Sequence, residues 1–168
     1  MSRLKPIYSA DLCDAAGIDR HRFDSWRALK MLGSSVKQGQ IFRRVFVPRD
    51  VLRFALLNAL IECGYVTRSA DRVLKSLDSL AELADVGSVW ADRVFSGKPT
   101  PEAYLLFVVG PDGRVIDAEH RTGLDRAADV VTAWIKSRPL TKLEQIGRVN
   151  ITQIARDAAA KLRERGCL

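Results

Sequence analysis

The sequence predicts an α+β protein, with a mostly helical N-terminal unit and a small mixed C-terminal unit. A chain of 168 residues with 47% hydrophobic and 28% charged residues is ordinary for a globular protein that buries a core. Apolar residues of the first half recur mainly at helical spacing, with two short β-prone runs between them. Two β-prone runs around a Gly-Pro-Asp-Gly turn open the second half. We therefore expect a helical unit at residues 1–85, a connection at residues 86–103 and an α+β unit at residues 104–168.

The helical unit opens with a helix-turn-helix pattern, SADLCDAAGIDRHRFDSWR, which begins at Ser9. Gly17 fits the tight turn because glycine adopts a left-handed backbone without a Cβ clash. Phe23 and Trp26 give the second helix an apolar side at a spacing of three residues. Ser9 and Asp19 are the expected N-caps of the two helices, since their side-chain oxygens accept hydrogen bonds from free amides.

A hairpin and two further helices complete this unit in the prediction. Residues 36–38 and 41–47 are the two β-prone runs of the hairpin. Pro48 suits a first helical position, and the helix that follows is expected to end at Gly64. Its apolar positions are Val51, Phe54, Leu57, Leu60 and Ile61. A further helix is expected over about residues 69–84.

Basic residues of the second helix and of the hairpin form the candidate site. A short arginine-rich helix fits a DNA major groove, where arginine pairs with guanine and serine with several bases. A basic hairpin beside it would contact the flanking phosphates. Residues 1–53 carry eleven Lys and Arg against five Asp and Glu, so most of the net charge of +7 lies here. The expected groove-facing residues are Arg20, His21, Arg22, Ser25 and Arg27, and the expected phosphate contacts are Lys37, Arg43 and Arg44. The alternative is an ordinary helix pair with a solvated face.

Over about residues 7–80 the chain resembles the winged helix-turn-helix DNA-binding domain of the MerR family. The matching residues are Tyr8, Leu12, Ala16, Gly17, Ile18, Trp26, Arg44, Phe46, Asp50, Val51, Phe54, Leu57, Leu60, Gly64 and Tyr65. The resemblance implies a transcriptional regulator that binds double-stranded DNA as a homodimer. Excisionases of mobile elements share this fold, so an excisionase-like DNA-architectural factor is the alternative, together with a protein-protein adaptor.

Three features depart from the family pattern. Lys30 stands where a glycine usually follows the recognition helix, and Asp24 stands where a basic residue is common. An acidic group at that position repels phosphate or accepts a hydrogen bond from cytosine. The long coiled coil through which family members dimerise is not visible, so a dimer would have to form through the C-terminal unit.

The C-terminal unit is predicted as hairpin, helix, strand and helix. Strands are expected at residues 104–109 and 114–120, then a helix that stops before Pro139, a short strand at residues 148–151 and a helix from Thr152. The first helix is expected to be capped by Thr122 and to turn inward Leu124, Ala127, Ala128, Val131, Trp134 and Ile135. The second is expected to turn inward Ile154, Ala155, Ala158 and Leu162. In the connection, Trp90, Val94 and Phe95 predict a helical turn that packs on a neighbouring unit.

The remaining patterns favour no enzyme, metal site or cofactor. Cys13, Cys63 and Cys167 stand at no ligand spacing, and no CxxC or HxxxH motif is present. Asp112, Asp117, Glu119 and His120 are too local to indicate a catalytic pair. Of the basic residues of the last helix, Arg156 could add a DNA contact, and Lys161, Arg163 and Arg165 could either do so or interact with a helix C-terminus.

No apolar run approaches the length of a membrane span, and the N-terminus lacks the apolar core of a signal peptide. We therefore expect a cytoplasmic protein without membrane contact. A small-molecule effector or a protein partner at the C-terminal unit stays open.

Overall fold

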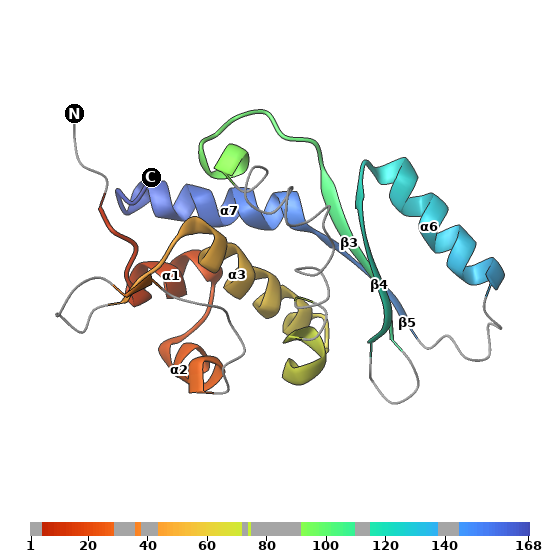
Figure 1. Cartoon of the computed structure of the whole chain (residues 1–168), viewed down its shortest axis with the longest axis horizontal. Coiled ribbons are helices and arrows are strands. Elements are labelled where there is room, and N and C mark those ends of the chain that lie inside the picture. Colours follow the sequence, from red (N-terminus) through yellow and green to blue (C-terminus); the bar gives the residue numbers. More distant parts are fainter. Residues whose placement is uncertain are drawn as a thin grey trace.

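The protein has a mixed α+β fold, so the predicted fold class is confirmed at this level (Figure 1). The computed structural model describes residues 5–28, 36–37, 44–71, 74, 92–109, 115–137 and 145–168. The predicted hairpin tip, the turn at residues 110–113 and most of the predicted helix at residues 69–84 lie outside the described residues. Within the described part of the chain, no helix is long and apolar enough to cross a membrane.

The named elements in the described part of the N-terminal half are helices and one short strand pair. They are α1 (Ser9–Ala16), α2 (Arg20–Ala28), β1 (Val36–Lys37), β2 (Arg44–Val45) and α3 (Pro48–Glu62). β1 and β2 pair in antiparallel fashion, with Val36 opposite Val45. Residues 67–71 and 74 are also helical, so the helix expected from Ser69 begins two residues earlier.

The ends of α1 and α2 test the predicted cap and turn residues. Gly17 has φ of 68°, in the left-handed region, and Asp19 Oδ1 accepts the Arg22 amide at 2.7 Å, as predicted for both residues. The prediction of Ser9 as an N-cap is wrong, because Ser9 is the first residue of α1. Instead, Asp11 in the first turn accepts the Tyr8 amide at 3.0 Å. An acidic residue at this position satisfies the amide that precedes the helix, so no serine cap is needed.

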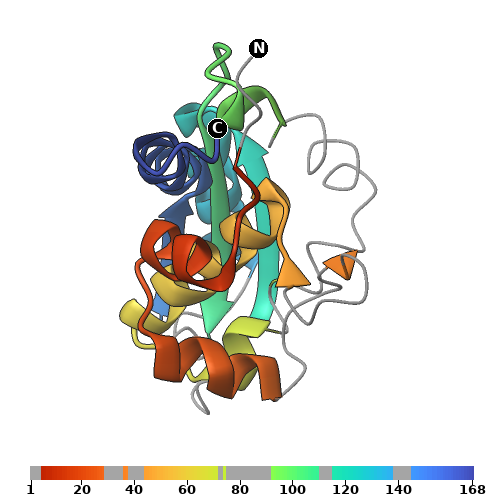
Figure 2. The same cartoon turned by 90° about the vertical axis from the view of Figure 1, so that its left-hand side faces the viewer.

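The C-terminal half contains a three-stranded antiparallel sheet. β3 (Ala103–Val109) lies between β4 (Val115–Thr122) and β5 (Gln145–Asn150). Alternate residues of β3 point to opposite faces. Tyr104, Leu106 and Val108 face α6 (Leu124–Ser137), whereas Leu105 and Phe107 belong to the core shared with α3 and α7 (Ile151–Glu164). The sheet is therefore covered on both faces, with α6 on one side and the other helices on the opposite side (Figures 1 and 2).

Several boundaries of the C-terminal half differ from the prediction by one to three residues. β5 begins at Gln145 rather than at residue 148, because Gly147 pairs opposite Phe107 within the strand. A Cβ at Gly147 would stand 1.9 Å from Phe107 Cε2, so the phenylalanine ring occupies the space that a side chain would fill. The prediction of Thr122 as a helix cap is also wrong. Thr122 ends β4, and Gly123, with φ of 85°, precedes α6.

Hydrogen bonds of Asn150 and Thr152 fix the start of α7. The helix begins at Ile151, one residue before the prediction, and Asn150 Oδ1 caps it by accepting the Gln153 amide at 3.0 Å. Thr152 is completely buried. Its hydroxyl accepts from the Ala103 amide at 2.7 Å and donates to the Pro101 carbonyl at 3.1 Å, so both hydroxyl functions are satisfied.

One hydrophobic core joins the two halves. It runs from Ile7 to Cys167 and includes side chains of α1, α3, β3 and α7. Val94 and Phe95 form part of a short helical segment in the predicted connection, and both are 4% exposed within this core, as expected; Trp90 lies outside the described residues. The N-terminal helices thus pack directly on the last helix, and residues from both sides of the predicted connection share this core.

The prediction for α6 is only partly confirmed. Ala127 and Trp134 are buried against the sheet and Val131 is half-buried. Leu124 and Ile135, which were expected to point inward, are 50% and 41% exposed, and Ala128 is exposed as well. The apolar arc of this helix is wider than the part that the sheet covers, so periodicity alone overestimated its burial.

Candidate nucleic-acid interface

A cluster of aromatic rings fixes α2, which carries most of the candidate site. Phe23 is fully buried and stacks on Phe54 of α3, with ring centroids 5.3 Å apart. Phe23 also meets Phe46, just after β2, edge to face at 5.8 Å. Trp26 is 5% exposed and lies 6.2 Å from Phe54. Burial of two such side chains contributes about 2 kcal/mol each. These contacts set the position of α2 relative to both α3 and the β1–β2 pair.

A buried amide on α3 holds the turn between α1 and α2. Asn58 is 5% exposed. Its Nδ2 donates to the Gly17 carbonyl at 3.3 Å and to Glu62 Oε1 at 2.9 Å, while its Oδ1 accepts from Arg22 Nη1 at 3.0 Å. Asn58 was not among the predicted site residues. The available signal was a single amide within the apolar run LLNALIE.

Arg20 and Arg27 lie on one face of α2 and share a carboxylate. Arg20 Nε donates to Asp24 Oδ2 at 2.9 Å, and Arg27 Nη1 lies 3.9 Å from Asp24 Oδ1. Both guanidinium groups also lie near the Phe23 ring, at 5.3 Å and 5.9 Å from its centroid. Arg20 donates further to Ser9 Oγ at 2.6 Å. The two arginines are therefore oriented side chains, and their charge is partly offset by Asp24.

The other predicted helix residues lie on two further sides of α2. His21 is exposed and Ser25 half-buried, and both stand roughly opposite the buried Phe23 and Trp26 by helical periodicity. Arg22 points toward α3, where it contacts Asn58, so it is not grouped with Arg20 and Arg27. The structure therefore divides the predicted groove-facing set into three parts.

The predicted hairpin residues are described only in part. Lys37 and Arg44 pair across the β1–β2 ladder through their backbones, and their side chains lie outside the description. Arg43 lies outside the described residues. The exit of β2 is fixed by an isolated antiparallel bridge between Ile7 and Phe46, in which the Phe46 amide donates to the Ile7 carbonyl at 2.9 Å.

The basic residues of α7 are all engaged within the protein. Lys161 Nζ donates to the Asp14 carbonyl near the end of α1 at 3.1 Å. Arg163 Nη2 donates to the Phe95 carbonyl at the end of the short helical segment at 2.9 Å. Each cation thus meets the negative end of another helix dipole rather than that of its own helix. Arg165 binds the side chain of Asp14 at 2.7 Å. Lys161 and Arg163 therefore compensate the ends of other helices.

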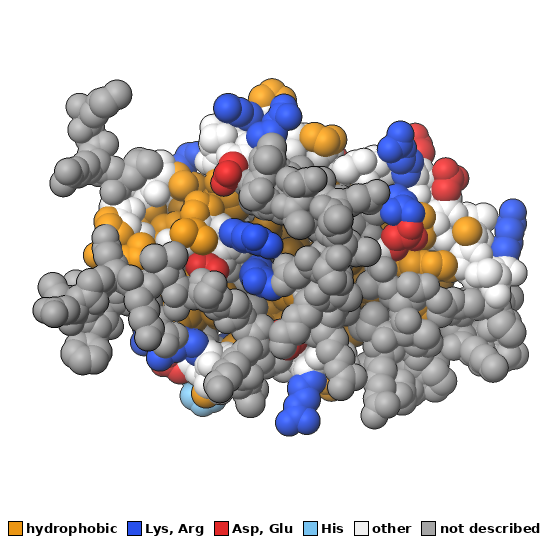
Figure 3. Space-filling model, in the orientation of Figure 1, with side chains coloured by type: hydrophobic (Ala, Val, Ile, Leu, Met, Phe, Trp, Pro, Cys, Tyr) orange, Lys and Arg blue, Asp and Glu red, His pale blue; other side chains and the backbone are white. Residues whose placement is uncertain are grey.

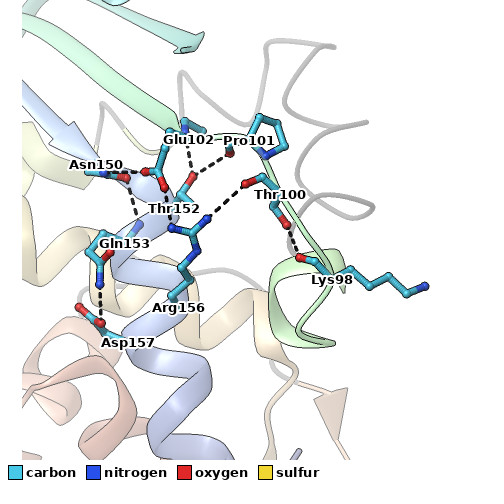
Figure 4. A network of polar contacts seen from close by, with 10 residues as sticks. Lys98, Thr100, Pro101, Glu102, Asn150, Thr152, Gln153, Arg156 and Asp157 are labelled. Carbon is cyan, nitrogen blue, oxygen red and sulfur yellow. Dashed lines mark hydrogen bonds and ion pairs between the residues drawn. The ribbon is translucent and has the colours of Figure 1, made fainter. Parts of the chain in front are cut away.

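A network of polar side chains ties the start of α7 to the start of β3 (Figure 4). Glu102 accepts from Arg156 Nη1 at 2.5 Å and from Asn150 Nδ2 at 2.8 Å. Arg156 Nη2 also donates to the Thr100 carbonyl at 3.2 Å. The hydrogen bond from Asn150, together with the charge of Arg156, lowers the pKa of Glu102. Because the lowered pKa favours the ionised carboxylate, these contacts hold the start of α7 against the start of β3.

Asp11 is a second residue that was not among the predicted site residues. Its side chain is 3% exposed and lies 3.0 Å from Lys5 Nζ and 3.3 Å from Arg165 Nη1. Burial by itself would raise the pKa of Asp11, but the hydrogen bonds from Lys5 and the Tyr8 amide outweigh it, so the pKa is lowered. The Lys5 amide also donates to the Gly166 carbonyl at 3.1 Å. This cluster joins residues near the two ends of the chain.

Among the described residues, no group of three or more His, Cys, Asp and Glu side chains could hold a metal ion. The chain matches no protein-family model, and no curated protein is similar to it. The geometry of α2 and its surroundings is therefore the basis for a functional proposal.

Proposed function

We propose that this protein is a sequence-specific double-stranded DNA-binding regulator that places α2 in the major groove and the β1–β2 pair on flanking phosphates. The resemblance to the MerR-like winged helix-turn-helix over residues 7–80 suggested this function. The left-handed Gly17 between α1 and α2, the antiparallel β1–β2 pair and the helix that begins at Pro48 support it, because they follow one another in the order of that pattern.

The observation that carries the proposal is the way α2 is mounted. Its nine residues, about 13 Å long, are anchored to the described core through Phe23 and Trp26. The other sides carry the polar residues, and Phe23 also contacts Phe46 next to the β1–β2 pair. A major groove about 12 Å wide admits a helix presented in this way.

The charged residues then have distinct proposed roles. Ser25 and His21, opposite the anchored side, would meet base edges, while Arg20 and Arg27 would contact bases or phosphates along one flank. Arg22 is a positioning residue, because its guanidinium group holds Asn58. Lys37, Arg43 and Arg44 would bind phosphates.

The test is selection of bound duplexes from a random pool, followed by anisotropy titrations across a salt series. The wild type should enrich one motif and bind it tightly. The slope of log K against log salt concentration should be about −0.9 for each phosphate that the protein neutralises. Ser25→Ala should change the motif, whereas Arg27→Ala should weaken binding to it. Arg126→Ala is the matched control, because Arg126 is an exposed arginine on α6. Recovery of no motif, or equal effects of Arg27→Ala and Arg126→Ala, would refute the proposal.

One observation favours a second candidate, a protein-protein adaptor. Asp24 lies between Arg20 and Arg27 and reduces the positive charge that a phosphate backbone would meet. An adaptor would bind heparin, single strands and duplexes with equal weak affinity, and one protein tightly.

DNA-binding regulators with a helix-turn-helix usually read two half-sites as dimers, so we also propose a homodimer formed through the C-terminal unit.

A further inference from the structure

An apolar stripe on α6 is largely exposed within the described part of the molecule. Leu124, Ala128, Val131 and Ile135 follow one another at spacings of four, three and four residues, so they lie along one line of the helix. Leu124 and Ile135 are 50% and 41% exposed, and Ala128 is exposed. Val131 is half-buried and packs at the edge of the cluster between α6 and the sheet. Hydrophobic side chains reach the surface over α6 beside acidic and basic ones (Figure 3).

Apart from Val131, this stripe lies outside the face that α6 turns to the sheet. The buried residues are Ala127 and Trp134, which pack with Tyr104 and Val108 of β3. At about 100° per residue, the centre of the stripe lies about 80° around the helix from that face. The sheet therefore leaves one flank of the apolar arc open.

We infer that a second copy of this chain covers the stripe, with the two α6 helices antiparallel about a two-fold axis. The spacing of the stripe is unchanged when the helix is reversed, which is the requirement of an isologous interface. In such a pair Leu124 meets Ile135 of the other copy, and Ala128 meets Val131. The small side chain of Ala128 near the axis allows the helices to approach closely.

The charges beside the stripe are also self-complementary. Asp125 and Lys136 are both exposed and lie on the same flank of the stripe, at opposite ends of the helix. Reversal about the axis places Asp125 of one copy within two helical positions, about 3 Å along the axis, of Lys136 of the other. Two reciprocal ion pairs result. A partner of unrelated sequence would not require this symmetry of charge and spacing.

The strength of the interface follows from its size. One helix pair buries less than the roughly 800 Å² per partner of a stable complex. The dimer is therefore expected to be weak and to dissociate on dilution. This inference goes beyond DNA binding and does not rest on it, because association is measured without DNA.

The test is sedimentation equilibrium of the full chain over a concentration series, with two matched variants of the same helix. Ala128→Glu places like charges near the axis and should weaken association by more than about tenfold. Ala133→Glu makes the same change at an exposed position on the opposite side of α6 and should leave association unchanged. Circular dichroism of both variants checks that α6 is folded. A wild type that stays monomeric at about 200 µM, or equal effects of the two variants, would overturn the inference.

The ion pairs allow a second, independent test. Asp125→Lys and Lys136→Asp should each weaken association, and the double variant should restore it. Both single changes also oppose the dipole of α6, and the double variant does not repair that effect. Recovery of association without recovery of thermal stability would therefore identify the contact between copies, and no recovery of association would rule out the pairing.

Discussion

Replacement of Asn58 by alanine tests whether the turn between α1 and α2 is held from α3. The change removes three hydrogen bonds, of 2.9, 3.0 and 3.3 Å, from a side chain that is 5% exposed. Each is worth about 1 kcal/mol net, and the bond to the charged Arg22 somewhat more. The Arg22 side chain is 46% exposed, so its lost bond is largely replaced by water. We expect the free energy of unfolding to fall by about 2 kcal/mol.

Urea unfolding measures this change through the midpoint, with the slope m unchanged. A double-mutant cycle with Arg22→Ala isolates the contact between the two side chains and should give a coupling energy of at least about 0.5 kcal/mol. Under conditions where Asn58→Ala stays folded, the variant should lose preference for the selected DNA motif, because α2 is no longer held at a fixed angle to α1. A loss below about 0.5 kcal/mol with no coupling would refute the role assigned to Asn58.

Three further changes test other parts of the structure. Gly147→Ala should destabilise the protein by about 3 kcal/mol, because the added Cβ would stand 1.9 Å from a Phe107 ring atom. Adding Phe107→Leu to this variant should recover much of the lost stability, as measured by thermal unfolding. Asp11→Asn should destabilise at neutral pH, and the difference from wild type should vanish in acid. The folded pKa of Asp11 is lowered, so its contribution is complete above the unfolded value of about 3.9 and is lost as pH falls through the folded value; an unchanged difference at low pH would contradict this. Asp24→Asn should strengthen binding to all duplexes and steepen the salt dependence, and weaker binding would show that Asp24 contacts a base.

The elements that the sequence predicted well have causes within a few residues. Gly17 is left-handed because the turn between two short helices demands it, and Pro48 starts α3 because its missing amide costs nothing there. Asp19 caps α2 through an amide three residues away. The buried strand β3 was predicted from an unbroken apolar run, because a strand covered on both faces needs apolar residues at successive positions.

The predictions that failed depended on partners remote in the sequence. The exposure of Leu124 and Ile135 depends on how much of α6 the sheet covers, which periodicity does not contain. The strand position of Gly147 follows from the ring of Phe107, forty residues earlier. Lys161 was ambiguous for the same reason, since its acceptor is the carbonyl of Asp14 in the first helix.

The sequence alone determined the fold class, the order of the elements and the concentration of positive charge in the first 53 residues, because these follow from periodicity, turn chemistry and composition. Tertiary structure decided what the described basic side chains contact. It turned Arg22 toward Asn58, set Asp24 between Arg20 and Arg27, and placed Lys161 and Arg165 against the end of α1. The formal charge of a residue in the sequence does not show what its side chain can bind, because the neighbouring groups in the folded chain determine its contacts and its pKa.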